Sequence, residues 1–178
     1  MEDFKFRDMR RNKQILSQEA AEKILREGEF GILALFDGNY SYAVPLNYAV
    51  EGNKIYFHCA KVGHKLDAIR NNDKVSFCVV DRHDVIAEEF TTYFTSVIAF
   101  GTIKIVEDNA DPDKLRGLEL LADKYSSTAN AERREKELSR LNSLFVPVMT
   151  IEHLTGKAAR ELVKRGRFFE ELLWGKIF

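Results

Sequence analysis

The sequence predicts a mainly β protein, a small barrel of six antiparallel strands with helices at its periphery. Six apolar, β-branched runs are bounded by turn residues, as in all-β domains. The first three runs follow one another with no helix between them, whereas parallel α/β winding would need one. Neither common nucleotide-binding glycine motif, G-x-G-x-x-G or G-x-x-x-x-G-K-[ST], is found in the sequence.

The bulk composition is that of a single ordinary domain. The chain has 178 residues, 45% of them apolar, which suits one domain with a substantial core. A net charge of −1 provides no overall basic field for nucleic acid. We therefore expect one domain spanning residues 1–178 and no nucleic-acid partner.

The first half of the chain begins with a predicted helix. Ser17 is a suitable N-cap for residues 17–27, and Gly28 can end the helix. Strands are then expected at 31–37, 40–50 and 54–60. Turns of the Asp-Gly-Asn and Glu-Gly-Asn type join them, so we expect an antiparallel meander.

The second half alternates strands and helices. A helix is expected at 64–71, a strand at 74–80, a polar loop at 81–90 and a long strand at 92–107. In that long strand Gly101 marks a bulge or a close approach between backbones. Further helices are expected from Asp111 and at 131–141, the second as a solvated charged face, and a last strand at 144–152. The tail from residue 156 is predicted to be helical, with 163–178 as a C-terminal helical extension.

The loop after the third strand carries the strongest functional signal. Lys61, His64 and Lys65 surround Gly63 where a helix begins. A lysine in a first helical turn is unfavourable against the helix dipole unless an anion lies near. Backbone N–H groups at a helix start bind phosphate well. We predict a phosphate-bearing ligand here; the alternative is that Lys65 simply points into water.

A proline and an asparagine in the second strand suggest a second part of the site. Pro45 cannot donate to a ladder, so its segment is an edge strand, a bulge, or a surface that faces a flat ligand. Asn47 can both donate and accept, which suits the edge of a heterocycle. Pattern alone favours the plain edge strand.

Two further residues at the end of the third strand have alternative interpretations. His58 is a core histidine, a phosphate contact or a reactive group, and spacing alone favours the first. Cys59 is more often a small buried hydrophobe than a reactive thiol. The histidines and the two cysteines lack zinc spacing, so no metal site is expected.

Cysteine content and hydropathy bear on the cellular compartment. No disulfide framework, apolar signal core or membrane-length apolar run is found, so we expect a cytoplasmic protein with no membrane partner.

Four motifs together resemble a known family. They are A-V-P-L-N-Y, K-I-Y-F-H-C-A-x-x-G-H-K, K-V-S-F-C-V and T-S-V-I-A-F-G. The chain resembles the pyridoxamine 5′-phosphate oxidase-like flavin-binding split barrels, and within them the subgroup related to nitroimidazole-resistance proteins. The resemblance covers residues 6–161.

The resemblance implies a six-stranded antiparallel split β-barrel and a homodimer with FMN at its interface, FAD being the alternative flavin. Carried over by position, the cofactor-binding residues are Val44, Pro45, Leu46, Asn47, His58, Cys59, Ala60, Lys61, His64, Lys65, Ser96 and Val97. The first four would border the ring, and His64 and Lys65 would hold the phosphate. His58 and His64 are the candidates for a reactive histidine.

The resemblance also implies a function. We expect a flavin-dependent oxidoreductase that takes a hydride from NADH or NADPH and passes electrons to a small acceptor such as a nitro-aromatic. The sequence does not match the arginine and histidine set of a vitamin B6 substrate pocket, so oxidation of pyridoxamine phosphate is not expected. The alternative is a non-catalytic dimeric split barrel that holds flavin or haem.

Overall fold

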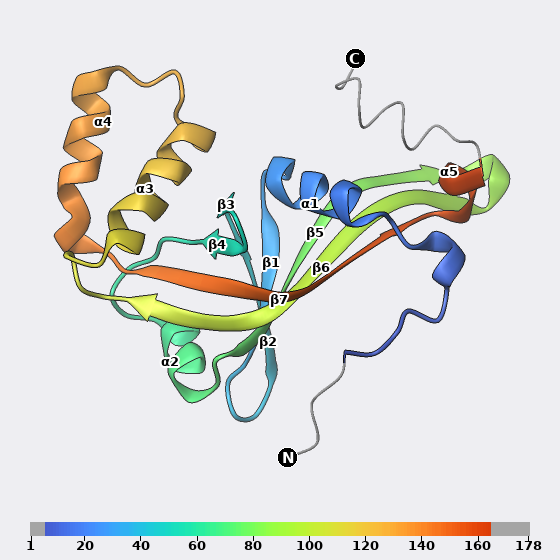
Figure 1. Cartoon of the computed structure of the whole chain (residues 1–178), viewed down its shortest axis with the longest axis horizontal. Helices are drawn as coiled ribbons and strands as arrows, with labels where there is room; N and C mark the ends of the chain where they lie inside the picture. The colour runs from blue at the N-terminus through green and yellow to red at the C-terminus, as the bar shows by residue number, and fades with distance from the viewer. Residues whose placement is uncertain (1–5, 165–178) are drawn as a thin grey trace. The chain divides into compact units, whose positions relative to one another are not determined.

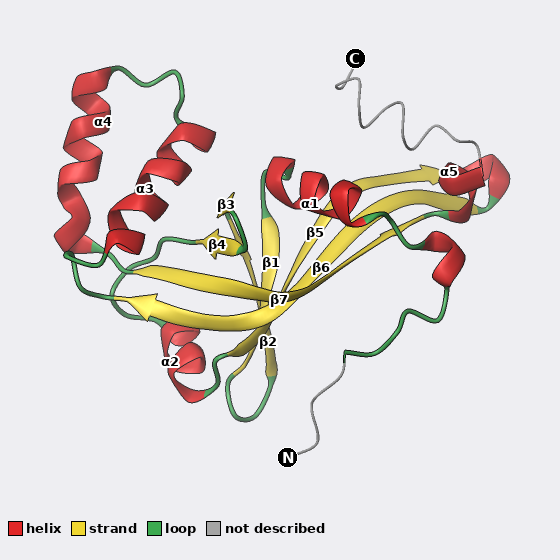
Figure 2. Cartoon of the chain, in the orientation of Figure 1, coloured by secondary structure: helices red, strands yellow, loops and turns green. Residues whose placement is uncertain are grey.

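The structure is a computed structural model that describes residues 6–164. These residues form two compact units. The first contains residues up to Gly28, Val79–Ile98 and the chain from His153; the second contains Glu29–Cys78 and Ala99–Glu152. Figure 1 labels the elements, and Figure 2 distinguishes helices from strands. No described helix is long and apolar enough to cross a membrane.

The described residues form a seven-stranded sheet in the order β2-β1-β5-β6-β7-β4-β3. The strands are β1 Gly31–Phe36, β2 Ser41–Leu46, β3 Ala49–Glu51, β4 Lys54–Tyr56, β5 Lys74–Ile86, β6 Thr91–Val106 and β7 Val146–Ala158. β1 pairs antiparallel with β2 and β5, and β4 pairs antiparallel with β3 and β7. The mainly β fold class is confirmed, with seven strands in place of the expected six.

The extra strand arises because the expected strand at 40–50 is broken. β2 pairs with β1, with Leu33 opposite Val44, but β3 pairs with β4. Between them Tyr48 is fully buried. Both expected hairpins, β1–β2 and β3–β4, are present, but β2 and β3 lie at opposite ends of the sheet order, so the expected continuous meander was wrong. The third expected strand is also shorter, since regular pairing ends at Tyr56.

The expected loop at 81–90 was wrong for most of its length. β5 continues to Ile86, and a short 3-10 helix, Ala87–Glu89, follows before β6. The side chains of this stretch are mostly exposed, so no inward-outward alternation appears in the sequence. Polar groups pair here instead: the Thr95 hydroxyl donates to Asp81 at 2.7 Å.

β7 also extends further than expected. It runs through Gly156 to Ala158, where the tail was predicted to be helical already. A Cβ on Gly156 would lie 3.0 Å from Ala21 and Leu16, so the strand packs closely on the start of the chain. α5, Arg160–Lys164, follows, and the remainder of the predicted extension at 163–178 lies outside the described residues.

The predicted helices near the site are present. α2 spans His64–Asn71, and α3 spans Pro112–Tyr125 with Asp111 as its N-cap. α4 spans Ala131–Leu138, three residues shorter than expected. In the first unit, α1 covers Gln18–Glu27, and the Ser17 hydroxyl caps it by accepting from the Ala20 N–H.

Two packing features fix the second unit. One hydrophobic cluster consists of Tyr56, Val106, Val146 and Val148, with Leu118, Leu120 and Leu144 against it. A Cβ on Gly101 would lie only 1.9 Å from the carbonyl oxygen of Thr150. Gly101 is thus the site of a close backbone approach, one of its two predicted roles.

Candidate functional site

The loop before α2 is shaped to present backbone N–H groups. Gly63 has φ +139°, a conformation that side-chain-bearing residues rarely adopt. Gly63 is the N-cap residue, and no side chain caps this helix start. The Leu66 N–H turns back to the Gly63 carbonyl at 2.9 Å. The N–H groups of His64 and Lys65, which precede Leu66 in the first turn, have no such partner in the described part of the chain and are available to an anion from outside.

The three basic residues of the loop have different surroundings. Lys65 is half-buried, and its ammonium lowers the pKa of His58. Lys61 is exposed, with its ammonium 5.6 Å from the centre of the Phe145 ring. Lys65 is thus the lysine whose charge acts within the predicted site, while Lys61 stands at its rim.

His64 is held by the β1–β2 hairpin. Its Nε2 lies 3.0 Å from Asp37 Oδ2, and its ring stacks on Tyr42 with 4.3 Å between ring centres. The pKa of Asp37 is lowered, chiefly by the N–H groups of Tyr40 and Asn39 and further by His64. The hairpin therefore fixes the position of the first residue of α2.

His58 and Cys59 occupy different environments. The His58 side chain lies exposed in the cavity wall, where partial desolvation is the main cause of its lowered pKa, followed by the Lys65 charge. Cys59 is buried and exchanges two 3.0 Å backbone hydrogen bonds with Phe145. Burial raises the pKa of its thiol. The lowered pKa favours the neutral form of His58, and the raised pKa favours the protonated, less nucleophilic form of the Cys59 thiol.

The segment around Pro45 forms an exposed apolar face. β2 is the end strand of the sheet order, as an edge-strand proline requires. Pro45 is exposed opposite Ile32, and both Ile32 and Phe36 on the same side of β1 are about two-fifths exposed, at 40% and 44%. Val44 and Leu46 are half-buried.

Asn47 lies where the chain leaves β2. Its amide nitrogen donates to the Glu29 carbonyl at 3.2 Å. This hydrogen bond holds the segment between β2 and β3 in place. Its Oδ1 has no hydrogen-bond partner among the described residues and remains available as an acceptor.

Ser96 and Val97 belong to the first unit, whereas the other ten predicted residues belong to the second. Ser96 is half-buried on β6 and Val97 is buried. The neighbouring Thr95 uses its hydroxyl across the strands, where it donates to Asp81. Assignment of Ser96 and Val97 to a cofactor stays a prediction.

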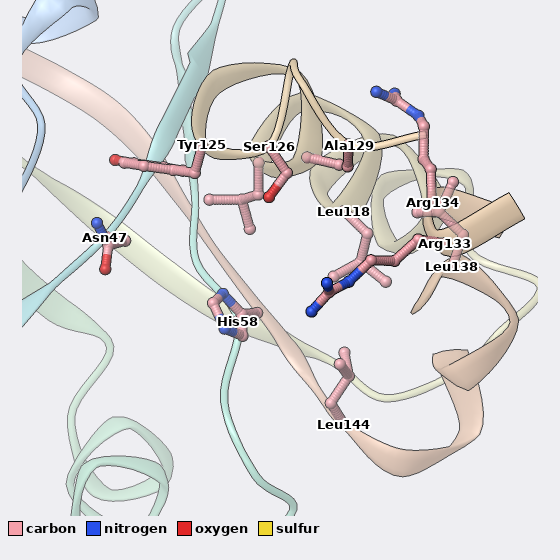
Figure 3. Close-up of a pocket in the computed structure, with 12 residues that line it drawn as sticks. Asn47, His58, Leu118, Tyr125, Ser126, Ala129, Arg133, Arg134, Leu138 and Leu144 are labelled. Atoms are coloured by element: carbon pink, nitrogen blue, oxygen red, sulfur yellow. The ribbon is translucent and has the colours of Figure 1, made fainter. Parts of the chain in front are cut away.

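A cavity of about 360 Å³ opens beside Asn47 and His58. Figure 3 shows that α3, α4 and the residue Leu144 form its other walls. The lining residues are Asn47, His58, Leu118, Leu121, Ala122, Tyr125, Ser126, Ala129, Arg133, Arg134, Leu138 and Leu144.

The sequence interpretation missed the helical part of this cavity. It treated α4 as a solvated charged face, although Arg133 and Arg134 line the cavity. A signal exists on α3, where the lining residues 118, 121, 122 and 125 follow helical spacing. The described residues include no group of three or more metal-ligating side chains.

Comparisons with known proteins give a consistent result. A family model described as pyridoxamine 5′-phosphate oxidase matches residues 17–158. An uncharacterized protein of Rhizobium meliloti (strain 1021) is 32% identical over 69 residues. That stretch is 38% of this chain and 44% of the relative, so the match spans less than half of the relative's length.

Two solved structures share the fold. A candidate 5-nitroimidazole antibiotic resistance protein from Bacteroides thetaiotaomicron VPI-5482 has a TM-score of 0.68 and 18% identity, over 81% of this chain and 86% of that one. An FAD and haem binding protein from Mycobacterium smegmatis has a TM-score of 0.65 and 21% identity, over 86% and 80%. These matches confirm the resemblance inferred from the sequence motifs.

Proposed function

Because the chain belongs to the pyridoxamine 5′-phosphate oxidase family, we propose that it binds a flavin, with the flavin phosphate at the start of α2. The single observation that carries this proposal is the helix start at Gly63. It combines a positive φ, uncapped N–H groups and the half-buried Lys65. These are the groups that phosphate requires: aligned N–H donors, the positive end of a helix dipole and a nearby cation.

The remaining residues fit the other parts of a flavin mononucleotide. Asn47 offers an amide oxygen as acceptor, and β2 presents Pro45 on an exposed apolar face. An isoalloxazine ring needs both an apolar surface and hydrogen-bonding groups at its edge. FMN matches this set, and FAD would share its phosphate and ring; the Mycobacterium smegmatis structure is of an FAD and haem binding protein.

The apolar face also supports a homodimer. Ile32, Phe36 and Pro45 expose apolar surface on one side of the β1–β2 hairpin. A second copy of the chain would cover this surface and complete the ring's environment. Sedimentation velocity should give twice the 20.5 kDa chain mass. A monomer that holds one flavin per chain would contradict the shared site.

We propose oxidoreductase activity as the leading function. When bound, the flavin would supply two-electron chemistry, with NADH or NADPH as donor and a small nitro-aromatic as acceptor. The protein would position the ring along β2, anchor its phosphate at α2, and place His58 where it can pass to the acceptor the proton that the acceptor takes up with the two electrons. Reduction of the acceptor consumes the two electrons that the nicotinamide provides as hydride.

A non-catalytic flavin- or haem-binding protein is the second candidate. The buried Cys59 thiol has a raised pKa, and the His64 imidazole is engaged with Asp37. These two features leave His58 as the remaining candidate for proton transfer among the predicted site residues. Binding without turnover would follow if His58 cannot reach the acceptor.

The visible spectrum of the purified protein tests both candidates. We expect flavin absorption bands, release of FMN identified by mass, and bleaching by NADH or NADPH without oxygen. A flavin that both donors leave oxidised would favour the binding protein. Absence of a flavin band, together with no uptake of FMN or FAD, would contradict flavin binding altogether.

A further inference from the structure

The cavity between α3, α4 and His58 is lined by basic side chains and by no acidic ones. Its twelve lining residues include two arginines and a histidine, and no aspartate or glutamate. The rest of the wall is largely apolar, with Leu118, Leu121, Leu138 and Leu144. At about 360 Å³ the cavity lies within the range of small-molecule sites. It therefore suits a small ligand with an apolar body and a negative charge.

The two arginines have different roles. Arg134 donates to the Asp123 carboxylate at 2.6 Å, which ties α4 to α3. Figure 3 shows the Arg134 guanidinium pointing away from the cavity and that of Arg133 pointing into it. Arg133 has no ion pair with any carboxylate whose position the structure describes. Its charge is thus available to a ligand.

The position of Arg133 on α4 is fixed by the helix start. The Asn130 side chain accepts a hydrogen bond from the Arg133 N–H at 2.8 Å. This is an N-cap contact, which sets the first turn of the helix. Arg133 therefore extends from a capped turn, and the Arg134–Asp123 pair holds the same turn against α3.

We propose that this cavity binds the electron acceptor and selects a small aryl carboxylate, with Arg133 binding the carboxylate. This inference rests on the proposed function, because the predicted flavin residues Asn47 and His58 also line the cavity. The aryl body would lie against the leucine wall and its other end would face the ring. A guanidinium holds a carboxylate through two parallel hydrogen bonds.

Calorimetry with matched probes tests the proposal. The probes are 4-nitrobenzoate and its neutral analogue 4-nitrobenzamide, titrated into flavin-loaded and flavin-free protein. The variants are Arg133→Gln and, as control, Lys136→Gln, an exposed residue of the same helix outside the cavity lining. We expect tighter binding of the carboxylate, a loss of about ten- to a hundredfold in Arg133→Gln, and no change in the control.

Three results would overturn it. They are equal affinity for the two probes, equal losses in the two variants, and binding of the carboxylate only when flavin is absent. The last would mean that the cavity belongs to the cofactor. If the protein takes up no flavin, the proposed function fails separately. Arg133-dependent binding of the carboxylate by the flavin-free protein would still support the anion site.

Discussion

Asp113, at the start of α3, binds two lysines and a tyrosine. Its carboxylate accepts from Lys54 at 2.8 Å and from the Tyr56 hydroxyl at 3.1 Å, and Lys104 lies at 3.2 Å. Its pKa is lowered, first by the Lys54 hydrogen bond and then by Lys104 and Tyr56. In turn, burial and the Asp113 charge raise the pKa of Tyr56 to about 12. One residue thus joins α3 to β4 and β6.

This cluster predicts a pH-dependent contribution to stability. A carboxyl group with a lowered folded-state pKa stabilises the fold above its ordinary pKa of 3.8. That contribution disappears as the pH falls through the folded-state value. We expect Asp113→Asn to lower the free energy of unfolding by about 1–3 kcal/mol at pH 7. Urea titrations between pH 7 and pH 3 should show the difference shrinking below the ordinary pKa.

The matched control for this prediction is Asp67→Asn. The Asp67 side chain is 70% exposed and pairs only loosely with Arg70 at 3.7 Å. Its removal should change stability little at any pH. Equal effects of the two substitutions would show that the Asp113 cluster contributes nothing specific.

At the residue scale, features that depend on residues nearby in sequence were predicted better than features that depend on residues far away in sequence. The N-caps Ser17 and Asp111 and the helix start after Gly63 depend on neighbours in sequence, and all are present. The cavity position of Arg133 depends on the packing of α4 against α3 and on His58, which is far away in the chain. A run of charges carries no information about which member faces a cavity.

At the scale of elements, Tyr125 holds the break between β2 and β3. Its hydroxyl oxygen accepts from the Tyr48 N–H at 3.0 Å and lies 2.5 Å from the Glu29 carbonyl oxygen. Asn47 donates to the same carbonyl. The last residue of α3 thus fixes the point where the chain passes from one end of the sheet order to the other.

Tyr125→Phe should therefore destabilise the second unit. The substitution removes the acceptor of the buried Tyr48 N–H, which costs about 1–3 kcal/mol. Urea unfolding followed by circular dichroism measures the loss. Tyr40→Phe is the control, because Tyr40 is 77% exposed and its hydroxyl has no hydrogen bond among the described residues. A Tyr125→Phe variant as stable as the control would contradict this role.

Strand patterning explains which elements the sequence predicted. β1 alternates buried and exposed positions, so its period of two is visible in the sequence. The last part of β5, from residue 81 to residue 86, is mostly exposed and polar, and was therefore mistaken for a loop. The break at Asn47 follows from a contact with α3, and nothing in the local sequence indicates it.

At the scale of the whole molecule, the predicted cofactor residues divide between two compact units. Ten of them, including Lys65 and Asn47, belong to the second unit, and Ser96 and Val97 belong to the first. β5, β6 and β7 contribute residues to both units. Fold class and family could be predicted from the sequence because four short motifs carry them. The assembly depends on surfaces that meet only in the folded chain.

The central claim is that the start of α2 binds the flavin phosphate. The measurement is the dissociation constant of FMN for the flavin-free protein, followed by quenching of flavin fluorescence. It compares the wild type, Lys65→Ala and the exposed control Lys136→Ala. Loss of a charge-assisted contact should weaken binding about ten- to a hundredfold in Lys65→Ala and leave the control unchanged. An unchanged constant in Lys65→Ala would contradict the placement of the phosphate.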